Sequence, residues 1–307
     1  MDNWDHHWNC PVRPNSKLAV TGWKVTGNGF VCRLFWQGGD NKLRSSRYLS
    51  MTESWEPPIV FEGIDARPDT PISAAVFLGV PQYEVFYLNR SSTLRGFNFA
   101  ADETITKPDS INERPALSVG SGSEMGAYWP YVVYQNANVP FGNTGTGITV
   151  LPAVSNYGPS RAAGIVYRRE NGLLSIFAFG GDDAGSVWRV PNVPIPAATA
   201  IGAFAFARES NHSLTNTYVL YQDDDHAIKA VWQDESSEWE GPATVGEADP
   251  GTDIVCLTEQ VAGEANLVVE LAPQSYMRLC FWQFGGSIVE KRLAASGWED
   301  MGTIPTE

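Results

Sequence analysis

Alternating apolar and polar positions mark a β-hairpin near the start of the chain. Residues 31–37 are largely apolar, a Gly-Gly-Asp-Asn turn follows, and residues 42–48 form a second extended run. Turns of this composition between two such runs are typical of antiparallel hairpins. A short strand of small, apolar residues (17–23) precedes the hairpin, and Trp55 follows it. The pattern predicts a unit made of an inner strand, a hairpin and a tryptophan.

This unit recurs with a period of about fifty residues, which is typical of repeat architectures. Small, apolar strands are expected at residues 72–78, 116–120, 147–154, 200–207 and 253–258. Hairpin strands are expected at residues 83–88, 94–99, 131–135, 163–168, 173–179, 218–222, 228–232, 277–283 and 288–292, with Trp188, Trp239 and Trp298 after the last three hairpins. Four copies end a strand on Gln, at Gln37, Gln135, Gln222 and Gln283.

Repetition of a roughly four-stranded unit around an axis defines a β-propeller. Small residues in each first strand suit the crowded centre of a ring, and aromatic residues suit the wider space between blades. We predict an all-β fold: a single six-bladed β-propeller over residues 17–307, with mostly four-stranded blades and a compact third blade, after an N-terminal extension at residues 1–16. The period argues against a β-sandwich or a pair of them. The short third copy leaves a five-bladed count open.

Composition agrees with a fold of short strands and excludes some functions. The 29 Gly and 20 Pro residues among 307 fit many tight turns. No apolar run approaches the roughly twenty residues of a membrane helix, so no membrane span is expected. The net charge of −14 would be repelled by a phosphate backbone, which argues against nucleic-acid partners.

The cysteines gather near the two ends of the chain, at Cys10, Cys32, Cys256 and Cys280. They form no CxxC pair, which argues against a zinc cluster. If the ring brings the ends together, disulfides among them would staple its closure; four buried thiols are the alternative. Sequons at Asn89 and Asn211 are compatible with glycosylation, so we expect a secreted or secretory-pathway protein. Residues 1–10 lack the apolar core of a signal peptide, as a mature N-terminus also would.

The order of a small strand, an Arg-apolar-aromatic-aromatic-Gln strand, a turn, a Leu-Arg-Glu strand and a tryptophan resembles the fungal fucose-specific lectins, which are six-bladed propellers. The resemblance extends over residues 17–300. In that family, the Arg and Glu of each blade and a nearby Trp or Tyr hold fucose between adjacent blades. Arg and carboxylate groups bond sugar hydroxyls, and an aromatic ring covers the apolar sugar face. The resemblance implies fucosylated glycans as partners and Trp36, Trp282 and Trp298 as ligand-binding rings.

Most copies depart from that site. The positions of the family's Arg and Glu hold Arg33 and Ser45 in the first copy, Glu84 and Gly96 in the second, Gly164 and Ser175 in the fourth, and Tyr218 and Ala230 in the fifth. The sixth copy keeps Glu290, while Arg278 lies one residue out of register, which places it on the other face of a strand. At most one or two sites survive, so the avidity of a multivalent lectin is lost. A low-valency fucose lectin using Glu290 and Trp298 is one hypothesis.

Erased sugar sites also occur in the glycosylated hetero-Diels–Alderases of fungal tropolonic sesquiterpene biosynthesis, which the chain resembles in fold, size and sequons. This resemblance implies a pericyclase-type enzyme. Its reaction would be the intermolecular hetero-Diels–Alder cycloaddition of a tropolone-derived quinone methide with a humulene-type alkene. The substrates would be small, apolar terpenoid and tropolone molecules, with no cofactor. An apolar pocket orients the partners, and hydrogen-bond donors stabilise charge on oxygen.

The candidate catalytic residues are Arg33, Arg278, Glu290, Tyr134 and Tyr167. Their alternative role is structural, because strand Arg and Tyr side chains also fill gaps between blades. No nucleophile elbow or nucleotide-binding motif is present; residues 142–147 predict a turn. The histidines lack metal-ligand spacing, so no metal site is expected. We interpret the acidic turn at residues 223–225 as a solvated loop in preference to a cation site. A non-catalytic scaffold is the third functional hypothesis.

Overall fold

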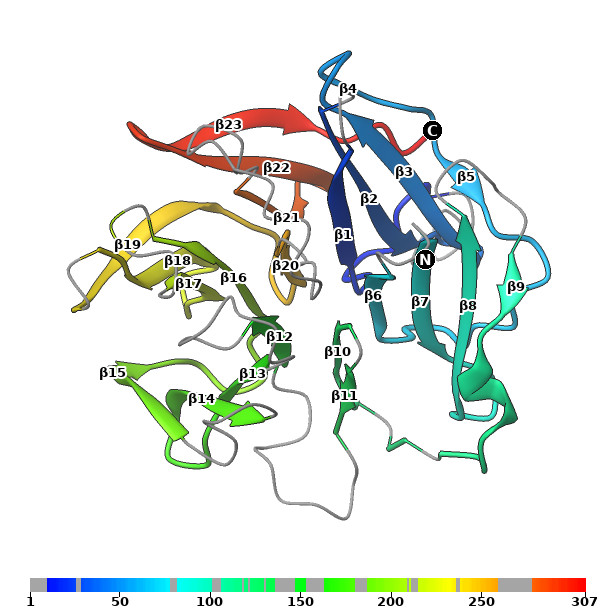
Figure 1. Ribbon diagram of the computed structural model, residues 1–307, viewed down its shortest axis with the longest axis horizontal. Coiled ribbons are helices and arrows are strands. Elements are labelled where there is room, and N and C mark those ends of the chain that lie inside the picture. Colours follow the sequence, from blue (N-terminus) through cyan, green and yellow to red (C-terminus); the bar gives the residue numbers. More distant parts are fainter. Residues whose placement is uncertain are drawn as a thin grey trace, which may run out of the picture.

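Six antiparallel sheets surround a central axis in the computed structural model (Figure 1). The fold is therefore the predicted all-β, six-bladed β-propeller. Among the residues that the structure describes, a single 3-10 helix, η2 (Ser110–Glu113), is the only helical element, and no helix is long and apolar enough to cross a membrane. The structure describes residues 10–25, 29–77, 82–100, 106–117, 119–120, 122–129, 131–135, 147–152, 163–179, 187–208, 210, 215–235, 238–258 and 278–307.

Blades one to three occupy the first half of the ring. Blade one contains β1 (Ala19–Val25), β2 (Gly29–Gln37), β3 (Leu43–Leu49), β4 (Ser54–Trp55) and β5 (Ile59–Val60). Blade two contains β6 (Ile72–Phe77), β7 (Gln82–Leu88), β8 (Leu94–Ala100) and β9 (Lys107–Pro108). Blade three contains β10 (Met125–Tyr128) and β11 (Tyr131–Tyr134). The predicted hairpin of blade one is confirmed, with Gln37 opposite Leu43 and Val31 opposite Leu49.

Blades four to six complete the ring with four strands each. Blade four contains β12 (Thr149–Pro152), β13 (Ala163–Arg168), β14 (Leu173–Phe179) and β15 (Val187–Pro194). Blade five contains β16 (Ile201–Ala207), β17 (Thr215–Gln222), β18 (Ala227–Gln233) and β19 (Trp239–Glu247). Blade six contains β20 (Ile254–Cys256), β21 (Leu279–Phe284), β22 (Ser287–Ala294) and β23 (Gly297–Thr303).

The inner strand of the compact third blade differs from the prediction. Residues 116, 117, 119 and 120 form no strand, and the inner strand is β10. Leu117 O accepts from Leu94 N and Val119 N donates to Ser92 O, so this segment runs along the hairpin of blade two. At the inner position, Gly126 is required because a Cβ there would lie 2.8 Å from Val150 Cγ2.

The core consists of one hydrophobic cluster at each of the six interfaces between neighbouring blades. The inner strands β1, β6, β10, β12, β16 and β20 contact one another in ring order around the axis. Large aromatic side chains, such as Phe35, Tyr83 and Phe99 between blades one and two, fill the wider space between blades, as predicted. The blades are therefore held to one another by apolar burial.

A repeated hydroxyl clamp fixes the position of the inner strands. A Ser or Thr just before the inner strand accepts the backbone N–H of the residue that ends the second strand. The pairs are Ser16 with Gln37 N (2.8 Å), Thr70 with Leu88 N (2.7 Å), Thr199 with Gln222 N (3.1 Å) and Thr252 with Gln283 N (2.7 Å). Each clamp ties the entry segment of a blade to that same blade.

The recurring Gln residues connect one blade to the next. Gln37 Nε2 donates to Asn41 O in its own hairpin turn and to Arg67 O in the segment entering blade two, both at 2.9 Å. Gln222 makes the same pair of bonds, to His226 O and to Asp249 O. The aromatic-plus-Gln ending that reveals the repeat is therefore an interblade connector.

The ring closes through hydrogen bonds between blade six and the segment before blade one. Gln283 Nε2 donates to Arg13 O and Leu18 N donates to Asp253 Oδ2, both at 2.8 Å. The part of the predicted N-terminal extension that the structure describes, residues 10–16, thus belongs to the closure.

The cysteines do not staple this closure. Cys256 and Cys280 form a disulfide between facing positions of β20 and β21, inside blade six. Cys10 and Cys32 are free. The expectation of a disulfide is confirmed, and its expected place between the chain ends is wrong, because the sequence does not show which cysteines face each other.

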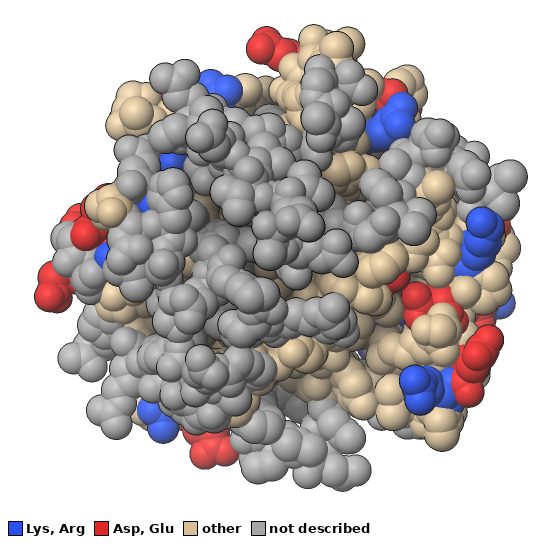
Figure 2. Space-filling model, viewed as in Figure 1, with Lys and Arg blue, Asp and Glu red and all other residues tan. Residues whose placement is uncertain are grey.

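On the face shown in Figure 2, the visible charged side chains lie mainly around the rim of the disc, with both signs interspersed. The visible part of this face therefore carries no patch of a single sign.

Replacing Thr252 by Ala tests the clamp at the closing blade. The substitution leaves Gln283 N buried without its acceptor, so we expect the free energy of unfolding to fall by about 1–3 kcal/mol in urea titrations. Thr303→Ala, at an exposed position of β23, is the matched control and should change it by less than about 0.5 kcal/mol. Equal effects of the two substitutions would contradict the clamp.

Candidate functional site

The resemblance places sugar sites at the interfaces between neighbouring blades. Between blades one and two, Arg33 is 4% exposed and Nη1 donates to Ser45 Oγ at 3.1 Å. Its Cζ lies 5.1 Å from the Tyr83 ring centroid and 5.2 Å from that of Phe99. Aromatic rings of blade two therefore occupy the space in front of the guanidinium, and this interface is closed.

The interface between blades two and three carries a buried carboxyl group. Glu84 is 5% exposed and accepts from Gln82 Nε2 at 3.1 Å. Burial, reinforced by the nearby Asp109 carboxylate, raises the pKa of Glu84 to about 7. A Cβ on Gly96 would lie 2.9 Å from the Cβ of Asp109, so the expected Glu position here admits only glycine without rearrangement. The two positions where the resemblance expects Arg and Glu therefore hold Glu84 and Gly96, and the described residues form no Arg–Glu pair there.

Blade four loses both sugar-binding side chains. In blade one, Ser45 pairs with Phe35, which lies two positions after Arg33. In blade four, Val166 lies two positions after Gly164, the equivalent of Arg33, and it pairs with Ile176. The prediction of Ser175 at this position is off by one residue, because Ser175 pairs with Tyr167. Ile176 is buried in the cluster between blades four and five.

The interface between blades five and six is aromatic. Phe204, Tyr218 and Trp232 face one another across three strands as a stacked ladder, with ring centroids 5.0 Å and 6.2 Å apart. Trp298 of blade six meets the Phe204 ring edge-on at 6.2 Å. Arg278 lies with its Cζ 3.9 Å from the Phe206 centroid, on the blade-five side of blade six. Arg278, which is one residue out of the family's register, therefore lies on the other face of the blade, as predicted.

The sixth interface, between blades six and one, keeps a carboxylate. Glu290 is 4% exposed, and its Oε2 accepts from the indole Nε1 of Trp55 at 2.8 Å. Trp55 meets Phe281 edge-on at 5.7 Å and Tyr48 at 5.4 Å. Burial raises the pKa of Glu290, while the hydrogen bond from Trp55 opposes that shift. The carboxylate is thus buried at this interface beside a group of aromatic rings.

A guanidinium shares that face. Leu279 occupies the family's Arg position, and Arg292 lies directly opposite it on β22. Because alternate residues of a strand point to the same side, Arg292 and Glu290 face blade one together. Arg292 binds Glu299 at 2.7 Å, and its side chain is 43% exposed. A guanidinium on the third strand thus lies opposite the second-strand position where the resemblance expects an arginine.

The predicted pairing of Glu290 with Trp298 is wrong. Trp298 is opposite Leu293, three residues from Glu290, and packs toward blade five. An odd separation along a strand places two side chains on opposite faces. The aromatic partner of Glu290 is Trp55, which is 235 residues away in the sequence.

The remaining candidates do not join this site. Tyr134 packs against the cluster between blades two and three, and Tyr167 lies on β13 of blade four. Trp36 and Trp282 are fully buried, and their indole Nε1 groups donate to Pro11 O and Glu247 O. Arg33, Tyr134, Tyr167, Arg278 and Glu290 are therefore distributed over four blades and form no single catalytic cluster.

Asn89 is 8% exposed, and its Oδ1 accepts the backbone N–H groups of Ser91 and Thr93. Asn211 lies outside the described residues, so glycosylation stays a prediction.

In the acidic turn, Asp223 Oδ1 accepts from Asp225 N and Ala227 N, which gives this carboxylate a turn-capping role.

Sequence reasoning missed three features of the molecule. Trp55 was overlooked because its partner belongs to the far end of the chain. Arg292 had a local signal, since it lies two residues after Glu290 and so shares its face. A third group, Lys17, Glu124 and Asp253, lies around the axis, each directly after the Ser or Thr that precedes an inner strand. Charged residues at equivalent repeat positions were a usable signal.

No protein-family model matches the sequence, and no curated protein matches it. Solved structures with a similar fold include the Aleuria aurantia lectin, a fungal six-bladed β-propeller with fucose recognition; it is 17% identical, with a TM-score of 0.72 over 97% of this chain and 98% of that chain. AofleA from Arthrobotrys oligospora is 13% identical, with a TM-score of 0.70 over 97% of this chain and 89% of that chain. The SapL1 lectin, solved with α-methyl fucoside, is 15% identical, with a TM-score of 0.70 over 96% and 98% of the two chains. At these identities the likeness shows the fold.

Replacing Glu84 by Gln tests its raised pKa. The folded chain holds this proton up to about pH 7, whereas the unfolded chain releases it near pH 4.3. Wild-type stability should therefore fall as the pH rises through this window, by about 1–3 kcal/mol, and Glu84→Gln should remove that loss. Urea titrations between pH 4 and 8 measure it, with exposed Glu113→Gln as the control. Parallel pH profiles of wild type and Glu84→Gln would contradict the assignment.

Proposed function

We propose that this propeller is a carbohydrate-binding protein of low valency, whose sugar site is the interface between blade six and blade one. The observation that carries the proposal is Glu290, a buried carboxylate at the family's Glu position that is hydrogen-bonded to Trp55 of the adjacent blade. At the corresponding positions, blade one holds Arg33 and Ser45 and has no carboxylate, while blades two, four and five hold a glycine, aliphatic or aromatic residue at one or both positions.

The groups at this site suit a sugar ring. The Trp55 hydrogen bond occupies Oε2 of Glu290, which leaves Oε1 to accept from a sugar hydroxyl. The guanidinium of Arg292 supplies charged donors at the exposed side, and the half-buried ring of Trp55, packed on the buried ring of Tyr48, supplies an apolar surface. Fucosylated glycans are the proposed ligands, since the SapL1 and Aleuria aurantia lectins are solved with fucosides. A secreted location is part of this proposal, and the disulfide supports it.

Replacing Glu290 by Gln tests the site. Titration calorimetry with α-methyl-L-fucoside and a fucosylated glycan should give one site per chain. Glu290→Gln should weaken binding by about 10- to 100-fold, because a hydrogen bond to a charged acceptor is lost. Asp300→Asn is the matched control in the same blade, because its carboxylate pairs with Lys291.

Three results would count against the site. These are absence of any sugar signal on a glycan array, a stoichiometry of several sites, or unchanged binding by Glu290→Gln. Retention of the wild-type melting temperature by the variant shows that weakened binding is not a consequence of unfolding.

A second candidate is the hetero-Diels–Alder enzyme, which stays a prediction. It is favoured by the aromatic ladder between blades five and six, where Tyr218, Trp232 and Trp298 are half-buried. Against it, the axial cavity has a volume of about 70 Å³, below the roughly 300–1,000 Å³ typical of small-molecule sites.

Incubation with a tropolone quinone-methide precursor and humulenol tests this second candidate. An enzyme should enrich one cycloadduct over the uncatalysed mixture, because bound partners react in one orientation. Chromatography of the products measures the ratio. A product mixture identical to that of the protein-free reaction would end this hypothesis.

A further inference from the structure

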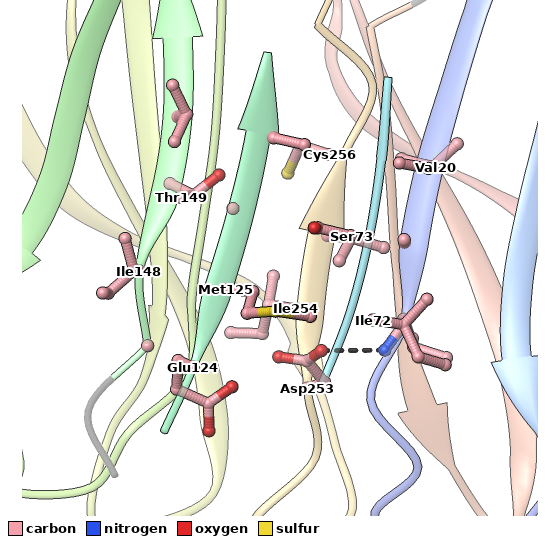
Figure 3. A pocket seen from close by; sticks show the side chains of 18 of the residues that line it. Val20, Ile72, Ser73, Glu124, Met125, Ile148, Thr149, Asp253, Ile254 and Cys256 are labelled. Carbon is pink, nitrogen blue, oxygen red and sulfur yellow. Dashed lines mark hydrogen bonds between the residues drawn. The ribbon is translucent and has the colours of Figure 1, made fainter. Parts of the chain in front are cut away.

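A small cavity lies on the axis of the ring, at a distance from the interblade sites. Its volume is about 70 Å³, and residues from the inner strands of all six blades line it (Figure 3). A water molecule needs about 10–15 Å³ of such volume, so the cavity has room for several water-sized groups. Most lining side chains are aliphatic, and the charged ones are Glu124 and Asp253.

These carboxylates lie at one end of the cavity and outnumber their cation. Lys17 Nζ lies 2.7 Å from Glu124 Oε1, while Asp253 uses Oδ2 to accept from Leu18 N. Lys17 is also close enough to Asp253 to interact with it electrostatically. Arg67 and Asp69 act on this group with opposite signs. Burial raises the pKa of Glu124, and Lys17 opposes that shift. When Glu124 and Asp253 are both ionised, one negative charge is left over in the group that they form with Lys17.

Ser73 supplies an independent sign of a missing partner. It lines the same cavity and is 4% exposed, and its Oγ has no hydrogen-bond partner among the residues that the structure describes. A buried hydroxyl without a partner is costly, so it indicates a bound group that is not protein. Ser73 lies two residues further along its inner strand than the position equivalent to Lys17, Glu124 and Asp253, which corresponds to about 6.6 Å. Figure 3 shows Ser73 and Asp253 among the residues that line the cavity.

We propose that the axial cavity binds a monovalent cation, Na⁺ or K⁺, between the Glu124 and Asp253 carboxylates and the Ser73 hydroxyl. Carboxylate and hydroxyl oxygens are ligands of hard cations, and one positive charge balances the excess negative charge. No group of three or more His, Cys, Asp or Glu side chains converges within the described residues, and Lys17 already contributes a positive charge. Both facts disfavour a divalent ion.

Thermal unfolding in different salts tests the proposal. The full chain is melted in NaCl, KCl and tetramethylammonium chloride at equal ionic strength, since tetramethylammonium is too large for the cavity. We expect the melting temperature to be about 2–4 °C higher in NaCl or KCl, because the ion binds only the folded chain. Ser73→Ala should abolish the difference between salts while melting in tetramethylammonium chloride at or above the wild-type temperature.

Ser54→Ala, at an exposed position of β4, is the matched control and should keep the full difference between salts. Sodium NMR gives a second readout, in which line broadening by the wild type should be lost in Ser73→Ala. Equal melting temperatures in all three salts would mean that water alone fills the cavity and would overturn the proposal. A shift that survives Ser73→Ala would do the same, as would a shift produced only by CaCl₂.

Discussion

The hydrogen bond from the end of a blade's second strand to the hydroxyl before its inner strand sets the geometry on which the molecule depends. It holds each inner strand at a fixed height relative to its own hairpin, in four of the blades. The Gln side chain at the same position then donates to the backbone of the segment that enters the next blade, which fixes the two blades relative to each other. Because the connection is local and repeated, the axis and the interblade clusters follow from it. The last copy, at Gln283, binds the start of the chain and makes the series a ring.

The ring explains why so few interfaces keep a polar site. Neighbouring blades must bury apolar surface to stay together, and any position not needed for a ligand is available for packing. Arg33 illustrates this outcome, since its guanidinium is covered by Tyr83 and Phe99. Glu290 is the exception, because an indole from the next blade satisfies its carboxylate and leaves the outer edge open to Arg292. The same scaffold therefore buries the guanidinium of Arg33 under aromatic rings at one interface and pairs the carboxylate of Glu290 with an indole at another.

Apolar periodicity and turn composition were sufficient to predict the fold, the hairpin of blade one and the face on which Arg278 lies. They failed at blade three, because small residues occur at 116–120 as well as at β10, and only packing against Val150 distinguishes the two. They also failed for the partner of Glu290: Trp298 is near in sequence and Trp55 is distant, yet strand parity and ring closure decide the contact. The cysteine pairing depends on cross-strand register, which composition does not contain. Local sequence pattern is thus enough to predict the secondary-structure elements. A site formed between blades six and one joins distant parts of the chain, so it can be recognised only in the assembled ring.

The position of the disulfide has a mechanical consequence. Cys256 and Cys280 brace the first two strands of blade six, so this pair of strands resists separation by covalent means. Blade six and the segment before blade one meet only through hydrogen bonds and side-chain packing among the described residues, including those from Gln283 to Arg13 O and from Leu18 to Asp253. Blade six can therefore separate from the segment before blade one without any covalent bond being broken. Separation of β20 from β21, in contrast, requires the disulfide to be reduced.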